Sequence, residues 1–288
     1  MNKYKKISQV LLWILIANLI VAFVKILLGI MLDINSLLAD GFHAITDSLS
    51  NIIGLIGIKL ASNPPNKDYP YGFQKFETIA GFIIGIMLLF IIGQIIYNAI
   101  FWFINPINPN ITIPSMIALF VTILINIFVA TFEYHQGKKY ESDVLISDSF
   151  HTKSDIFISS GVLLTMILVS LGLPAFIDPI VSLIISFFIF RSCLEIFKMT
   201  TAVLVDKKVM DEEKIIKMIK DIDEDIIDVH KIRSRGRMDH IYIDLHIITD
   251  PNKTVKEAHD LAHKIEKNLR EKFNKKIELL AHIEPNER

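Results

Sequence analysis

The chain has 288 residues, of which 52% are hydrophobic, and its mean hydropathy is +0.46. Of its 61 Asp, Glu, Lys and Arg residues, 37 lie in the last 83 positions, whereas the first 205 positions hold 12 acidic and 12 basic residues. This division excludes an evenly globular chain, a disordered chain and a basic nucleic-acid-binding protein. It predicts a membrane domain over residues 1–205 followed by a soluble domain over residues 206–288.

Six segments are apolar over a length that can cross a bilayer core of about 30 Å, which takes roughly 20 helical residues. They cover residues 8–32, 36–61, 75–103, 112–135, 141–171 and 176–200. The first of them is long enough to be retained as a span, so it is not taken for a signal peptide. The connections near 33–35, 104–111 and 172–178 contain no Lys or Arg, and the basic residues gather on the other side. Because cytoplasmic loops collect Lys and Arg, both termini are predicted to be cytoplasmic.

The soluble domain shows an alternation of helical and strand patterns. We expect a helix at 211–221, strands at 226–234 and 239–249, a helix from Thr254 to about residue 273, and a strand at 276–283. Glu257 follows Thr254 by three residues, which is the spacing of a capping box. The order αββαβ predicts a small α+β domain of the ferredoxin-like kind.

The second predicted span carries charged residues where charge is expensive. Asp40, His43 and Asp47 stand at i, i+3 and i+7, which places them on one face of a helix. An Asp at the centre of a membrane helix costs about 2.5–3.5 kcal/mol on insertion scales, so such a residue needs a compensating role.

The fifth predicted span repeats this pattern with Asp148, His151 and Asp155. If the two spans face each other, two imidazoles and two carboxylates converge, a donor set that suits zinc and leaves cobalt, cadmium and ferrous iron open. Hydrogen bonding between helices is the simpler alternative, but two copies on two spans favour a cation site. Asp40 and Asp148 lie one turn from each histidine, where they either hold the ring by a hydrogen bond or cap a polar seam.

With six spans, these paired motifs and a terminal α+β domain, the sequence resembles the cation diffusion facilitator family over nearly the whole chain. The resemblance implies a homodimer in the lipid bilayer that exchanges zinc or a related ion for protons. It also implies that the transport ligands are His43, Asp47, His151 and Asp155. Histidine in both motifs is similar to the zinc-type members, because manganese-type members tend to carry Asn or Asp there.

The loop before the third span departs from the family pattern H-P-Y-G-H-G-x-x-E. It reads YPYGFQKFE over residues 69–77, so Tyr69 and Phe73 replace both histidines. The loop zinc site of some members is therefore expected to be missing. Lys75 and Asp206 match positions that form a charge interlock between subunits in family members; the simpler alternative is two exposed charges at the membrane border.

Six of the nine histidines lie in the soluble domain, and along residues 240–247 polar and apolar side chains alternate between the two faces of a strand. Against the family pattern, five residues fall on positions of a regulatory metal site at the dimer interface: His230, His246, His259, His282 and Glu284. Glu284 stands where Asp is common. His240 and His263 have no such match and are expected to be surface residues.

The sequence thus predicts a divalent cation efflux transporter, with zinc first and iron, manganese or cobalt as alternatives. The ligands must lose protons to bind metal, and His has an ordinary pKa near 6.5, so exchange for protons is expected. A metalloenzyme is disfavoured because two His and two Asp fill the zinc shell and because no H-E-x-x-H, G-x-S-x-G or phosphate-binding loop is found.

A metal-responsive sensor that the spans merely anchor is the other alternative, and buried acids in two spans argue against it. Lys25, deep in the first span, pairs with an acid such as Asp40 or snorkels, and it is given no role in the site. The compact chain has no long His-rich loop between the fourth and fifth spans, which indicates a prokaryotic plasma membrane.

Overall fold

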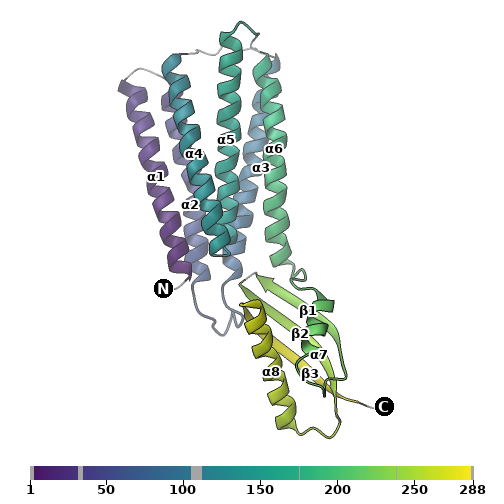
Figure 1. Cartoon of the computed structure of the whole chain (residues 1–288). Helices are drawn as coiled ribbons and strands as arrows, with labels where there is room; N and C mark the ends of the chain where they lie inside the picture. The colour runs from purple at the N-terminus through teal and green to yellow at the C-terminus, as the bar shows by residue number, and fades with distance from the viewer. Residues whose placement is uncertain (1–2, 32–34, 105–111, 175, 238, 287–288) are drawn as a thin grey trace. The chain divides into compact units, whose positions relative to one another are not determined.

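The computed structural model of the chain describes residues 3–31, 35–104, 112–174, 176–237 and 239–286. It divides into two compact units, Met1–Thr201 and Ala202–Arg288. The first unit is a bundle of long helices that run roughly alongside one another, and the second combines two helices with a small sheet (Figure 1).

The helices of the first unit follow the apolar segments of the sequence. Their bounds are α1 Lys3–Met31, α2 Asn35–Ala61, α3 Lys75–Ile104, α4 Ile113–Lys139, α5 Asp143–Ser170 and α6 Ile177–Leu204. Among the described residues, α1, α3, α4, α5 and α6 are long and apolar enough to cross a membrane. Helix α2 has 27 residues and carries the first polar motif. The predicted fold class, a multi-pass helical membrane domain followed by a small α+β domain, is confirmed.

Local sequence signals explain where two of these helices begin. Thr112 caps α4, since its hydroxyl accepts a hydrogen bond from the amide of Ser115 and the Ser115 side chain returns to the Thr112 backbone. Ser142 caps α5 in the same way by accepting from the amide of Leu145. The cap at Ser142 sets the start of the helix that carries the second polar motif.

Small residues allow close packing between the helices. A Cβ added at Gly57 of α2 would lie 2.4 Å from the Cβ of Ala80 of α3, and one added at Gly161 of α5 would lie 1.8 Å from the Cδ1 of Ile185 of α6. Glycine at a helix contact lets backbones approach closely. Helix α2 also contacts α5, as convergence of the two polar motifs requires.

The second unit has the predicted order αββαβ. Its elements are α7 Glu212–Lys220, β1 Asp228–Arg237, β2 His240–Thr249, α8 Val255–Phe273 and β3 Lys276–Pro285. The sheet order is β1-β2-β3, with β1 antiparallel and β3 parallel to the central β2. The capping box predicted at Thr254 and Glu257 is present at the start of α8.

Both helices of this unit cover one face of the sheet. Ile215 and Ile219 of α7 and Leu261, Ile265 and Leu269 of α8 join the inward residues of the strands in one core. Because side chains alternate along β2, the residues at even numbers from 240 to 248 lie on the opposite face. In β1 the register shifts between His230 and Arg233, where Lys231 has a φ of 50°, which is a β-bulge.

Candidate metal centres

Three residues of the two polar motifs come together inside the helix bundle. Asp47 of α2 and His151 and Asp155 of α5 each offer one ligand atom, and the three atoms lie within 4.8 Å of one another. His151 is 2% exposed, and neither of its ring nitrogens has a hydrogen-bond partner among the described residues. A buried imidazole usually makes hydrogen bonds, so these nitrogens are available to a ligand.

The three side chains line a cavity of about 230 Å³ between α1, α2, α4 and α5. Polar side chains from each helix face it, among them Asn18 and Lys25 of α1, Asn51 of α2, Asn126 of α4 and Ser159 of α5. A cavity between apolar helices that offers polar side chains can hold a cation, which hydrocarbon excludes. Lys25 is buried in this lining.

The other half of the first motif lies partly outside the described structure. The backbone of α2 is described, but the side chains of Asp40 and His43 are outside the described residues. The pairing expected between Lys25 and Asp40 therefore also involves a side chain outside the described residues.

Asp148 lies away from the ring of His151, among other buried polar side chains. Within the described residues it makes no hydrogen bond to the ring of His151, and its carboxylate instead contacts Asn51 of α2 and Glu133 of α4. Its Oδ2 accepts a hydrogen bond from the Nδ2 of Asn51, whose Oδ1 accepts from Asn18 at 3.2 Å. Asp148 therefore belongs to a buried polar seam.

Glu133 of α4 belongs to the same seam and did not figure among the residues singled out from the sequence. It is fully buried, and its Oε2 accepts a hydrogen bond of 2.9 Å from the hydroxyl of Thr152. Its signal was present in the sequence, because it is an acid inside the fourth predicted span.

Aromatic rings occupy the loop where some family members have histidines. The ring centroids of Tyr69 and Phe73 are 4.4 Å apart, and Phe76 lies 6.1 Å from Tyr69 and 5.8 Å from Phe73. These rings pack together and offer no imidazole for a metal.

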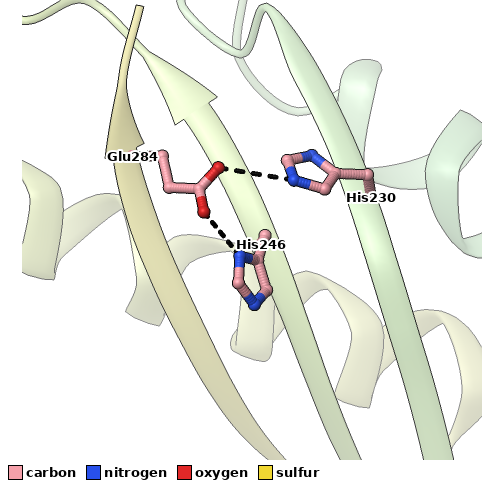
Figure 2. A group of neighbouring side chains, drawn as sticks. All are labelled: His230, His246 and Glu284. Atoms are coloured by element: carbon pink, nitrogen blue, oxygen red, sulfur yellow. Dashed lines mark hydrogen bonds and ion pairs between the residues drawn. The ribbon is translucent and has the colours of Figure 1, made fainter.

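A second group of ligand atoms lies in the other unit. His230 of β1, His246 of β2 and Glu284 of β3 each offer one atom, and these atoms lie within 4.8 Å of one another. Figure 2 shows the Glu284 carboxylate between the two imidazoles, with its Oε1 2.7 Å from the Nδ1 of His246 and its Oε2 3.3 Å from the Nε2 of His230. The three residues lie on the sheet face opposite the helices.

The remaining histidines of the unit are placed differently. The His282 ring lies 4.7 Å from that of His246, and its Nε2 is 3.8 Å from the Oε1 of Glu284, so it borders the group. His259 lies on α8, on the other side of the sheet, beside the exposed His263 at 4.5 Å.

The prediction that His240 is a surface residue is wrong. It is 4% exposed, its ring lies 4.6 Å from that of Tyr242, and its Nε2 is 2.7 Å from the Oε1 of Glu278 on β3. Pairing of β2 with β3 covers this end of the strand, which the sequence pattern alone did not indicate.

The pKa values of Glu284 and His240 are both lowered in this unit. The hydrogen bond from His246 lowers the pKa of Glu284, and burial lowers the pKa of His240. The ionised Glu284 carboxylate stabilises positive charge beside it. That charge can come from protonation of the two imidazoles or from a metal ion bound by all three side chains.

Lys75 is the exposed first residue of α3, and the Asp206 carboxylate lies 3.4 Å from Arg235 of the same unit. The charge interlock between Lys75 and Asp206 stays a prediction, since it joins residues of different units.

Long apolar helices around a group of candidate cation ligands are typical of a multi-pass membrane protein that handles metal ions. Comparison with known proteins gives the family: residues 11–205 match the cation efflux transmembrane domain, and residues 208–286 match the cation efflux protein cytoplasmic domain. The chain belongs to the cation efflux, or cation diffusion facilitator, family. This family consists of metal cation efflux transporters rather than enzymes.

Similar proteins cover nearly the whole length of the chain. The manganese efflux system protein MneP of Bacillus subtilis is 31% identical over 96% of this chain and 95% of that protein. An uncharacterised transporter of Methanocaldococcus jannaschii is 30% identical, over 92% and 94%. The cadmium, cobalt and zinc/H(+)-K(+) antiporter of Bacillus subtilis is 27% identical, over 85% and 79%.

Proposed function

We propose that this protein exports a divalent metal ion, zinc first, from the cytoplasm in exchange for protons. The ion in transit binds to Asp47, His151 and Asp155, with His43 as the fourth ligand. The observation that carries the proposal is the position of three ligand atoms within 4.8 Å of one another in a cavity between apolar helices.

The choice of zinc rests on chemistry. An imidazole is a better ligand for zinc, cobalt or cadmium than for manganese, which prefers oxygen. The similarity to MneP supports manganese as the second candidate, and that to the cadmium, cobalt and zinc antiporter supports the first. Iron is the remaining alternative.

The lining of the cavity supports a direction of release. It includes Ser115 to Asn126 from the first half of α4 and Ser159 to Met166 from the second half of α5. These halves lead to the helix ends that the distribution of Lys and Arg assigns to the outside. The ion would leave along this side, and both termini would lie in the cytoplasm.

Protons and metal compete for the same atoms. His151 binds a metal only as the neutral ring, and Asp47 and Asp155 bind it only as carboxylates. Protons taken up from the outside after release, and lost to the cytoplasm when the next ion binds, would drive export by the inward proton gradient.

The soluble unit has a regulatory role in this proposal. His230, His246 and Glu284, with His282 beside them, would bind a metal on the open sheet face where a second copy of the chain docks. His259 lies on the other side of the sheet in the same chain, so it would join this metal only from the second copy. Metal bound preferentially by the dimer stabilises the dimer by linkage.

Transport by inside-out proteoliposomes in a prokaryote-like lipid mixture tests the proposal. We expect zinc entry to raise the pH that a lumenal dye reports, with cobalt, iron and manganese compared in parallel. Asp47→Ala should abolish the signal, whereas Glu195→Ala, which changes an exposed acid of α6, should keep it. Unchanged flux in Asp47→Ala would overturn the site, and zinc binding to the soluble unit without any ion flux would favour the sensor.

A further inference from the structure

Two buried carboxyl groups lie in contact beside the proposed transport site. Glu133 of α4 is fully buried, Asp148 of α5 is 1% exposed, and the two carboxyl groups lie close enough to share a hydrogen bond. They lie outside the group of ligand atoms formed by Asp47, His151 and Asp155.

The outer oxygen of each carboxyl has a donor from the protein. Thr152 donates to the Oε2 of Glu133, and Asn51 donates to the Oδ2 of Asp148. The remaining oxygens, Oε1 of Glu133 and Oδ1 of Asp148, are buried and accept no hydrogen bond from any described residue. Buried oxygens without a donor are rare, and a proton held by the pair would supply a donor at this point.

The charges around the pair support this conclusion. Apart from the pair itself, Asp155 acts on Glu133, and both His151 and the hydroxyl of Ser50 act on Asp148. Asp47 of α2 and Lys25 of α1 line the adjoining cavity. Two carboxylates in contact repel each other strongly in a medium of low dielectric, whereas a single shared proton removes half of their charge.

We propose that Glu133 and Asp148 share one proton while the transport site is empty and release it when the metal binds. This inference rests on the proposed function, because it needs metal at Asp47, His151 and Asp155. The O–H bond breaks, its electron pair stays on the carboxyl oxygen, and the proton passes to water. The pair thereby adds one proton to those displaced from the ligands themselves.

The structure provides two routes of coupling between the pair and the site. A divalent cation beside Asp155 reverses the charge that Glu133 experiences from that side and favours the ionised pair. In addition, Thr152 follows His151 in the chain and donates to both the Glu133 carboxylate and the Asp148 carbonyl. A shift of this turn on metal binding would therefore change the hydrogen bonds of the pair.

The test counts protons released per zinc bound, by calorimetry of the full-length protein in buffers of different ionisation enthalpy. All proteins carry His246→Ala, so that zinc bound by the soluble unit does not contribute. We expect Glu133→Gln to bind zinc but to release about one proton fewer than its parent. Glu77→Gln is the matched control, since Glu77 is also fully buried but contacts Ser142 instead, and it should release the parent number.

Non-additivity identifies a shared proton. Asp148→Asn, and the double variant Glu133→Gln with Asp148→Asn, should each release the same number as Glu133→Gln. A parent-like number in Glu133→Gln, or a loss of two protons in the double variant, would overturn the proposal. If zinc instead binds the parent and its His151→Ala variant equally well, the transport site itself is wrong, which is a separate and recognisable failure.

Infrared spectroscopy covers the case in which the variants do not fold. The parent protein should lose absorbance of a protonated carboxyl group when zinc is added. A spectrum that shows no such loss would overturn the proposal without any variant of the pair.

Discussion

Replacement of His151 by alanine separates the role of this residue in binding from its role in stability. The ring is buried, and both of its nitrogens lack partners among the described residues. A residue present for stability would make hydrogen bonds, whereas a residue present for metal keeps its donor atoms open. If His151 is a metal ligand, the variant loses zinc affinity and keeps its stability without metal. If His151 is a structural residue, the variant loses stability without metal and keeps its zinc affinity.

The magnitude follows from the number of ligands. Zinc bound by four ligands in small structural sites contributes about 10 kcal/mol at the lower end, so one ligand of four accounts for about 2.5 kcal/mol, or roughly seventyfold in Kd. In the metal-free protein the alanine removes packing of about 2 kcal/mol but also two unsatisfied polar atoms that cost about 1–3 kcal/mol each. Without metal, we therefore expect the free energy of unfolding of the variant to lie within about 1 kcal/mol of that of the parent, or to exceed it.

The assay is zinc competition with a chromophoric chelator, with thermal unfolding of the metal-free protein in parallel, both in a His246→Ala background. His135→Ala is the control, because His135 is exposed on α4 and should alter neither quantity. A Kd within threefold of the parent, or a large loss of stability without metal, would refute the reasoning and make His151 a structural residue.

Gly161→Ala should destabilise the bundle by about 1–3 kcal/mol because its Cβ would overlap a side chain of α6, whereas Gly93→Ala, with no atom within 4 Å, should be neutral or better in thermal unfolding. His246→Ala should abolish zinc binding by the soluble unit, and His263→Ala, which changes an exposed histidine of α8, should leave it intact; titration calorimetry with both variants decides. Since burial lowers the pKa of His240, the folded state favours its neutral ring. That contribution to stability is complete above the ordinary His pKa near 6.5 and is lost as the pH falls below it. His240→Gln should therefore flatten the decline of the free energy of unfolding, measured with denaturant, between about pH 7 and pH 5. An unchanged dependence on pH would contradict the assignment.

Much of the architecture follows from periodicity and composition. Apolar runs of bilayer length give the long helices, because in hydrocarbon a helix satisfies its own backbone hydrogen bonds. The alternation at 240–247 and the capping box at Thr254 are local signals, and both elements are present as expected. The spacing of His151 and Asp155 likewise requires only one helix to place both on a single face.

Only the tertiary structure shows which residues of other helices and strands contact the residues in these local patterns. Contact between α2 and α5 brings Asp47 to His151 and Asp155, and only the packing of α4 shows that Glu133 meets Asp148. The alternation along the strand predicts His240 to be a surface residue, but the neighbouring strand of the sheet buries it. Periodicity states which side of an element a residue occupies, and only the packing of elements states what faces it, since partners distant in the sequence leave no local signal.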